Sequence, residues 1–146
     1  MATTAAILSR AWKLGLAVPA FNVPYIPMVE PVVRAVADLD SFALVEVARL
    51  EWVKFEAGSL EKVSEEFAKH HKPSHVRLHL DHVPVIDEDG LEVDTIEVIE
   101  RALAAGYQSV MVDGSRLPLA DNIRATRRVA ELAHRGGVAC EAELGA

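Results

Sequence analysis

The sequence contains one cysteine in 146 residues, no apolar run of membrane-spanning length and no basic cluster longer than Arg127-Arg128. A single cysteine leaves no disulfide framework, and Cys140 lies in an apolar run, so we interpret it as a small buried hydrophobe in a reducing compartment. The missing apolar run argues against a transmembrane helix. Polar residues interrupt the apolar ones throughout residues 1–16, which is not the pattern of a secretory signal peptide. We therefore expect a cytoplasmic protein.

Positive charge is also scarce. The formal net charge is −7, with 15 lysines and arginines against 22 aspartates and glutamates. An acidic chain without a basic stripe argues against a nucleic-acid surface and against an anionic membrane patch. Hydrophobic residues make up 51% of the chain, which is ample for one buried core. We expect residues 1–146 to form a single domain.

Apolar residues recur with two alternating periods along the chain. Short β-branched runs predict buried strands, and spacings of three and four predict helices. The predicted strands are residues 16–21, 42–47, 75–80, 108–112 and 138–142, and the predicted helices are residues 5–14, 26–39, 51–57, 59–70, 94–105 and 118–135. Ser59 and Asp94 are expected to cap their helices. The apolar face of the last helix is predicted to consist of Leu119, Ile123, Thr126, Ala130 and Ala133.

Strands that alternate with helices predict right-handed β-α-β units and a parallel sheet. Polar residues follow several of the predicted strands, at their carboxyl ends: Asn22, Asp81, His82, Asp113 and Glu143. A doubly wound sheet concentrates its site at one switch point, whereas a (β/α)8 barrel collects polar residues from successive strands. We therefore predict an α/β fold of the barrel type. A whole barrel needs ~250 residues, so this chain covers a little over half of one, about five parallel strands with flanking helices.

The pair Asp81-His82 is the strongest chemical signal in the sequence. It follows the extended run 75–80 and precedes Val83-Pro84, where proline ends regular pairing. An imidazole at a strand end is a metal ligand or a base, and a carboxylate beside it holds or gives a proton. The acidic segment 84–93 comes next, with a turn signal at Asp89-Gly90 that indicates a small hairpin or loop over the strand ends.

Five phrases of the sequence together resemble a known family. They are Val18-Pro19-Ala20-Phe21-Asn22-Val23, His79-Leu80-Asp81-His82, the run from Gly106 to Ser115, Asp121-Asn122-Ile123, and Glu141-Ala142-Glu143-Leu144-Gly145. In order and spacing they resemble the class II ketose-bisphosphate aldolases, the family of fructose- and tagatose-bisphosphate aldolases. The resemblance spans nearly the whole chain. It is strong from Leu78 onward and poor over residues 26–74.

The resemblance implies a function and a role for each residue. It implies reversible cleavage of a ketose 1,6-bisphosphate to dihydroxyacetone phosphate and an aldehyde, with a divalent metal, Zn²⁺ first of all. Asp81 matches the family's catalytic acid and base, and His82 matches one of three histidines on the zinc. Asp113 and Glu143 match acids offered to a second or alternative metal position, and Asn22 matches a residue near the phosphorylated sugar. His79 is interpreted as packing inside the barrel, not as a ligand.

The chain departs from the family pattern at several positions. Residues 48–52 replace a serine-containing substrate loop, and Arg116 stands where the family has a histidine; an arginine there could bind a phosphate or carboxylate. The other two zinc histidines and the late phosphate loops are absent, so we expect the amino-terminal part of a barrel that stops after the fifth strand and is inactive alone. Open sheet edges predict a homo-oligomer. Two alternatives are a non-catalytic half-barrel partner subunit and a small-molecule-binding α/β domain.

Overall fold

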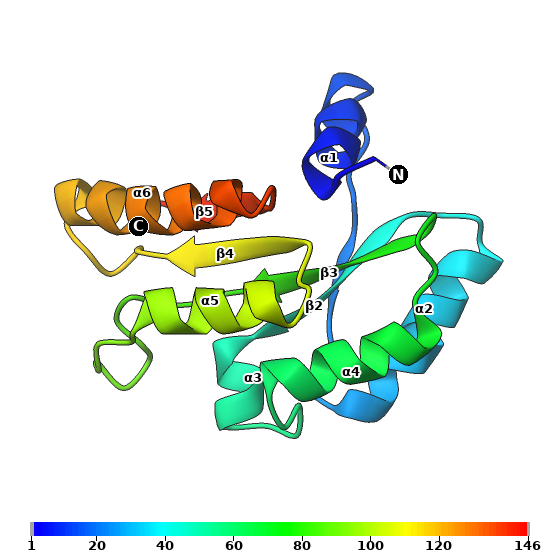
Figure 1. Cartoon of the computed structure of the whole chain (residues 1–146), viewed down its shortest axis with the longest axis horizontal. Helices are drawn as coiled ribbons and strands as arrows, with labels where there is room; N and C mark the ends of the chain where they lie inside the picture. Colours follow the sequence, from blue (N-terminus) through cyan, green and yellow to red (C-terminus); the bar gives the residue numbers. More distant parts are fainter. Residues whose placement is uncertain (1, 146) are drawn as a thin grey trace.

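The computed structural model describes residues 2–145, which form one five-stranded sheet covered by helices (Figure 1). Strands and helices alternate along most of the chain, as the sequence predicts. The strands are β1 (Ala20–Asn22), β2 (Ala43–Ala48), β3 (Val76–Asp81), β4 (Ser109–Asp113) and β5 (Ala139–Glu143). The helices are α1 (Thr4–Lys13), α2 (Val29–Asp38) after the 3-10 turn η1 (Ile26–Met28), α3 (Arg49–Val53), α4 (Leu60–His70), α5 (Thr95–Ala104) and α6 (Leu119–Arg135).

All the strands are parallel, and they lie in the sheet in the order in which they occur along the chain. One row of pairs runs across the sheet from Asn22 to Glu46, His79, Ser109 and Ala139. Each unit thus adds its strand to the same side, whereas a doubly wound sheet reverses its order at a switch point. The prediction of the first five strands of a (β/α)8 barrel is confirmed.

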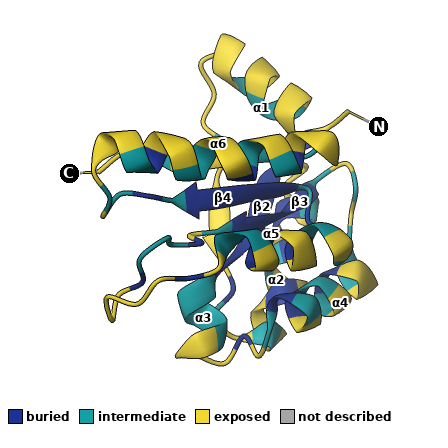
Figure 2. Ribbon diagram, turned by 60° about the vertical axis from the view of Figure 1, so that its left-hand side comes forward, coloured by how far each residue is buried: buried dark blue, intermediate teal, exposed yellow. Residues whose placement is uncertain are grey.

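The hydrophobic core lies between one face of this sheet and helices α2, α4, α5 and α6 (Figure 2). Alternate strand residues point into it, such as Val45 and Val47 of β2 and Leu78 and Leu80 of β3, none of them more than 1% exposed. The helices supply Val33, Val63, Ile99 and Val129 among others. Cys140 packs partly buried against this core, and burial raises the pKa of its thiol to about 11. The helices therefore form the outer wall of the partial barrel.

The other face of the sheet, which is the inner face of the barrel, carries polar side chains. Glu46, Arg77, His79 and Ser109 are all buried there. At the amino ends of the strands the Arg77 guanidinium donates to the backbone carbonyl of Ala2 at 3.3 Å, which ties the start of the chain to the sheet. His79 is 2% exposed, so the prediction that it packs inside the barrel is confirmed.

Two predicted helix caps are confirmed. Ser59 Oγ accepts a hydrogen bond from the backbone N–H of Lys62 at 3.2 Å, and α4 begins at the next residue. Asp94 Oδ1 accepts from the N–H of Glu97 at 3.0 Å in the same way and starts α5. Each cap satisfies one of the N–H groups that the first turn of a helix leaves without a partner.

The bounds of β1 and of α3 differ from the prediction. β1 begins at Ala20 and not at Leu16, because Pro19 has no N–H to give a strand and restricts the residue before it. α3 begins at Arg49, two residues early, because Glu51 Oε2 accepts the backbone N–H of Ala48 at 2.7 Å and caps the helix there. It ends at Val53, well before the predicted end of this helix.

The predicted apolar face of α6 is wrong at its amino-terminal end. Leu119 and Ile123 are 62% and 50% exposed, whereas Asn122 is 3% exposed and faces the sheet. Asn122 Nδ2 donates to the backbone carbonyl of Glu143 at 2.8 Å, and its Oδ1 accepts from Thr126 Oγ1 at 3.0 Å. These hydrogen bonds fix the rotation of the helix, which apolar spacing alone does not reveal.

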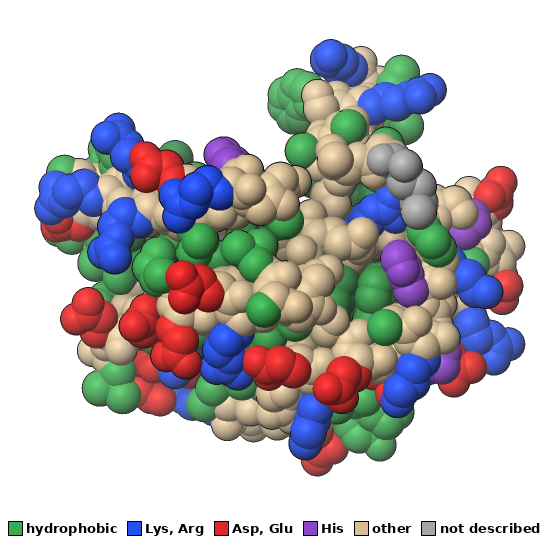
Figure 3. All heavy atoms as spheres, viewed as in Figure 1, with side chains coloured by type: hydrophobic (Ala, Val, Ile, Leu, Met, Phe, Trp, Pro, Cys, Tyr) green, Lys and Arg blue, Asp and Glu red, His purple; other side chains and the backbone are tan. Residues whose placement is uncertain are grey.

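The acidic segment after β3 forms the predicted hairpin. Ile86 and Glu92 form an antiparallel bridge, and the turn between them contains Gly90 at a φ of +80°, a conformation that favours glycine. Acidic side chains gather over this hairpin and the start of α5, while basic side chains gather over α6 (Figure 3). Across residues 2–145, no helix combines the length and the apolar character needed to cross a membrane.

Candidate metal and catalytic centre

The carboxyl ends of the strands bring all five predicted site residues to one edge of the sheet. Asn22, Asp81, Asp113 and Glu143 are the last residues of β1, β3, β4 and β5, and His82 follows Asp81 directly. Because the strands are parallel and adjacent in order, their ends meet without any long connection. Residues as far apart in the chain as Asn22 and Glu143 thus share one edge.

His82 lies at the centre of this group. Its Nδ1 is 3.4 Å from Asp113 Oδ2 and 3.4 Å from Glu143 Oε2, and its Nε2 is 3.8 Å from Asp81 Oδ1. One ligand atom from each of His82, Asp113 and Glu143 lies within 4.8 Å of the other two. The backbone of His82 has a φ of +27°, in the left-handed region that costs non-glycine residues about 1–3 kcal/mol. Such strain is typical of functional positions.

Charge balance at this edge favours a cation. Burial opposes the protonation of His82, but the carboxylates of Asp81, Asp113 and Glu143 outweigh it and raise the pKa of the imidazole. Burial likewise opposes ionisation of Asp113, but hydrogen bonds from Ser115 and His82 hold the pKa of that carboxyl below its ordinary value. The three carboxylates therefore stabilise positive charge at the place where His82 sits.

Glu143 contributes a second, independent sign of a cation. Its Oε2 is buried, and among the described residues it accepts no hydrogen bond, although His82 Nδ1 lies 3.4 Å away. An unpartnered buried carboxylate oxygen is costly unless a proton or a metal ion meets it. An imidazole and two carboxylates are suitable ligands for Zn²⁺ and for similar divalent ions, so His82, Asp113 and Glu143 fit such an ion.

The strand end that carries Glu143 is held by a close contact. Asn122 donates to the Glu143 carbonyl from α6, and Gly114 lies directly beneath the Asn122 amide. A Cβ on Gly114 would come within 2.3 Å of Asn122 Oδ1. Asn122 and Gly114 were not predicted as site residues. Both residues lie in the sequence phrases that resemble the aldolase family, and that position was the available indication that they matter to the site.

Asn22 contacts the proposed acid–base residue directly. Its Nδ2 donates to Asp81 Oδ2 at 3.0 Å and lies 3.4 Å from Glu51 Oε2. Burial raises the pKa of Glu51, whose Oε2 also accepts the N–H of Ala48. The sequence analysis did not identify Glu51 as a site residue. Its position three residues after Ala48, which is the spacing of a helix N-cap contact, was the pattern that could have indicated it. Asn22 thus links two acids that lie 30 residues apart.

Two further acids on the inner face were missed as well. Glu46 and Glu141 sit within strands below the rim, and burial raises the pKa of each. For Glu46 the pKa rises to about 7, with the neighbouring charge of Asp81 as the second cause. An acid inside a run of apolar residues was the available signal, since a carboxylate is rarely buried without a partner.

The hairpin reaches the same edge from outside. Asp87 is 4% exposed, and its Oδ2 lies 3.4 Å from Arg49 Nη1 of the segment after β2. Arg116 donates to the backbone carbonyl of Asp87. The two arginines that replace family residues therefore bind the hairpin in this structure.

Known proteins were compared with this chain. The model of the family described as fructose-bisphosphate aldolase class-II matches residues 2–146. A fructose-bisphosphate aldolase of Giardia intestinalis is 32% identical over 145 residues, which are 99% of this chain and 42% of that relative. The chain therefore spans less than half the length of the curated relative.

Solved structures agree with the sequence comparison. The YdjI aldolase of Escherichia coli K12 superposes with a TM-score of 0.74 at 26% identity, over 94% of this chain and 49% of that one. The fructose-bisphosphate aldolase of Campylobacter jejuni gives a TM-score of 0.69 at 25% identity, over 95% and 45% of the two chains. With matching phrases, strand order and family model all in agreement, the chain belongs to the class II fructose-bisphosphate aldolase family.

Proposed function

We propose that this chain supplies the amino-terminal part of the active site of a ketose-bisphosphate aldolase. The reaction is the reversible cleavage of a ketose 1,6-bisphosphate of the fructose or tagatose type to dihydroxyacetone phosphate and an aldehyde. One observation carries the proposal: the imidazole of His82 lies between the carboxylates of Asp81, Asp113 and Glu143 at the carboxyl edge of a barrel sheet. Membership in a metal-dependent family supports it.

His82, Asp113 and Glu143 would hold the divalent ion, and Zn²⁺ is our first choice because an imidazole is among its preferred ligands. When bound, such an ion supplies positive charge that stabilises the enediolate left when the carbon–carbon bond breaks. The left-handed backbone of His82 turns its ring toward the two acids, so the ligands are gathered before an ion arrives.

Asp81 is proposed as the acid and base. It would take the proton from the hydroxyl beside the bond that breaks and return one in the synthetic direction. Asn22 holds Asp81 through the 3.0 Å hydrogen bond to its Oδ2, which leaves Oδ1 on the side of His82. Asn22 is itself proposed to lie next to the phosphorylated sugar.

The proposal extends to the whole protein in three respects. We propose that residues 1–146 are one domain and the amino-terminal part of a barrel, and that the working enzyme is a cytoplasmic homo-oligomer. The family's other two zinc histidines and its phosphate loops have no counterpart in these 146 residues, so activity requires the rest of the barrel. Phosphate binding is expected from that part, because the edge described here is rich in carboxylates.

The test compares Asp81→Asn with His82→Ala in the complete protein that carries this chain. Asp81→Asn keeps the size of the side chain but cannot take up a proton, so the ion held by His82, Asp113 and Glu143 is retained while turnover falls by ~10²–10⁴. His82→Ala loses metal, and with it the exchange of the α-proton of the ketose phosphate. Added metal rescues this variant poorly.

Metal analysis and turnover are measured together on both variants. Glu131→Gln on the outer helix α6 is a matched control that removes one carboxylate far from the strand ends, and it should change neither quantity. Loss of the ion held by His82, Asp113 and Glu143 in Asp81→Asn as well as in His82→Ala, or normal turnover in Asp81→Asn, would reject the catalytic assignment. Full metal content without any cleavage in the unmodified protein would favour a non-catalytic partner role.

A further inference from the structure

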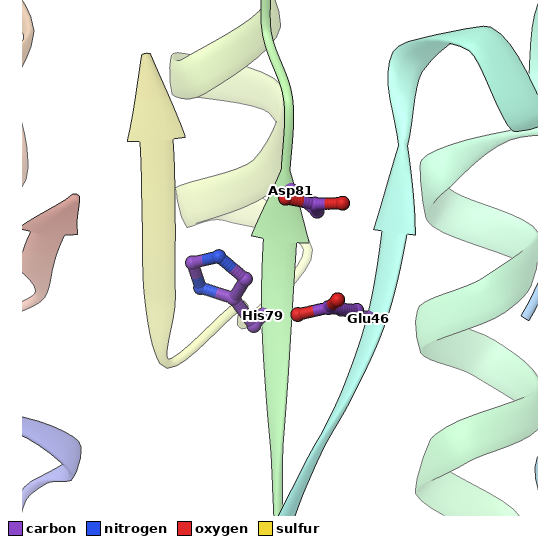
Figure 4. A group of neighbouring side chains, drawn as sticks. All are labelled: Glu46, His79 and Asp81. Atoms are coloured by element: carbon purple, nitrogen blue, oxygen red, sulfur yellow. The ribbon is translucent and has the colours of Figure 1, made fainter. Parts of the chain in front are cut away.

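A second group of ligand-type atoms lies one layer deeper in the barrel than His82. β2 and β3 place Glu46 and His79 on the inner face, below the rim where Asp81 stands (Figure 4). Glu141 of β5 lies beside them, with its Oε2 3.6 Å from His79 Nε2. Neither Glu46 nor His79 has a part in the proposed aldol chemistry. The group is separate from the ligand set of His82, Asp113 and Glu143, with which it shares no residue.

Glu46 is a largely buried acid that forms no side-chain hydrogen bond. It is 9% exposed in the middle of β2, and within residues 2–145 no hydrogen bond reaches its side-chain oxygens, which keep some contact with solvent. Figure 4 shows its carboxylate directed across to β3, where His79 and Asp81 stand. A buried ionised carboxylate costs several kcal/mol unless a cation or a donor compensates it. A positive partner or a proton would therefore stabilise this side chain.

His79 can offer a lone pair toward the same place. Its Nδ1 lies 2.8 Å from Ser109 Oγ, a hydroxyl that can accept from the ring. With the proton on Nδ1, Nε2 is an acceptor, and it lies 3.6 Å from Glu141 Oε2. Metal-binding histidines commonly use one ring N–H in this manner to fix the other nitrogen on the ion.

We propose that Glu46, Nε2 of His79 and Asp81 bind a divalent cation, which we call the inner site. One ligand atom from each of the three lies within 4.8 Å of the other two, and Glu141 flanks them. Two carboxylates and one imidazole suit Mn²⁺, Zn²⁺ or Co²⁺. The ion would give Glu46 the partner that it lacks and would bind Nε2 of His79 between the two carboxylates.

A cation in the inner site would also affect Asp81 at the rim of the barrel. Asp81 Oδ1 is 3.8 Å from His82 Nε2, so Asp81 stands between the inner site and the outer site of His82, Asp113 and Glu143. A cation below Asp81 keeps that carboxylate ionised and fixes its orientation. The inner site shares Asp81 with the proposed aldol chemistry, but its evidence lies in Glu46 and His79, which have no part in that chemistry.

The competing explanation is a shared proton. Burial raises the pKa of Glu46 to about 7, so near neutral pH its carboxyl could instead stay protonated and donate to Asp81. The two explanations can be distinguished above that pH. A carboxyl with this pKa is then ionised, so a proton no longer occupies the site and a cation can bind there.

The experiment titrates the metal-free 146-residue chain with Mn²⁺ at about pH 8, above the Glu46 pKa, and follows free Mn²⁺ by electron paramagnetic resonance. The unmodified chain should bind two ions, one at each site. Glu46→Gln should bind one, at the outer site, and His82→Ala should bind one, at the inner site. The double variant should bind none, and Glu100→Gln on the outer helix α5 should bind two like the unmodified chain.

A spectroscopic measurement identifies the inner ligand. In His82→Ala the electron spin echo of bound Mn²⁺ should show one imidazole nitrogen, and adding His79→Gln should remove that signal. Circular dichroism verifies folding, and His79→Gln serves as the second inner-site variant if Glu46→Gln does not fold. A single bound ion in the unmodified chain, or two ions in both Glu46→Gln and His79→Gln, would refute the inner site without affecting the aldolase proposal.

Discussion

The close packing of Gly114 against Asn122 leads to a testable prediction about what holds the strand end that carries Glu143. Gly114 is buried after β4, and a Cβ placed there would lie 2.3 Å from Asn122 Oδ1 and 2.5 Å from its Cγ. Both distances are far below van der Waals contact, so the substitution Gly114→Ala must displace the Asn122 amide. That amide holds the Glu143 carbonyl at 2.8 Å and accepts from Thr126 Oγ1 at 3.0 Å.

The cost follows from these contacts. Forcing an extra methyl group into a packed site costs ~1–3 kcal/mol. The displaced amide loses two hydrogen bonds, at about 1 kcal/mol each. We expect Gly114→Ala to lower the free energy of unfolding by about 3–5 kcal/mol in total. For a domain of this size that corresponds to a fall in the melting temperature of about 10–15 °C. Outer-site metal affinity should fall too, because Glu143 loses its anchor.

A double-mutant cycle measures the contact itself. Melting temperatures and urea denaturation are compared for Gly114→Ala, Asn122→Ala and the double variant, because removal of the Asn122 side chain also removes the clash. The double variant should be more stable than the sum of the two single changes predicts, by more than ~1 kcal/mol. Additive losses, or a Gly114→Ala chain that melts like the unmodified one, would refute the packing argument.

Three further predictions concern the isolated chain. The purified 146 residues should not cleave fructose bisphosphate, since they contain only one, His82, of the three metal-binding histidines that the family resemblance implies; a rate within about tenfold of an intact relative would contradict this. The open edge at β5 should cause self-association, and sedimentation as a monomer with protected amides in residues 138–142 would argue against it. Arg101 contacts Glu61 at 2.9 and 3.2 Å and lowers its pKa to about 2, against an opposing effect of burial. Stability from this pair should thus be complete above the ordinary pKa of 4.5 and decline as pH falls toward 2, and melting curves of Glu61→Gln should lack that decline.

The fold and the rim of the site could be predicted because both depend on local pattern. Alternating periods identified the strands, and a polar residue at the end of several strands identified the edge at which Asp81, His82, Asp113 and Glu143 meet. In a parallel sheet with sequential strand order, such ends converge whatever the details of packing. The caps at Ser59 and Asp94 were predictable for the same reason, since a cap involves residues only three apart.

Tertiary structure decided what depends on contacts between distant residues. The rotation of α6 is set by the hydrogen bond from Asn122 to Glu143, 21 residues away, and apolar spacing placed Leu119 and Ile123 on the wrong side. The burial of Glu46 depends on the two strands beside β2, because a side chain loses water to its neighbours in space and not to its neighbours in sequence. The sequence alone determined the barrel sheet and its acidic edge, and the folded chain decided which buried groups have no partner.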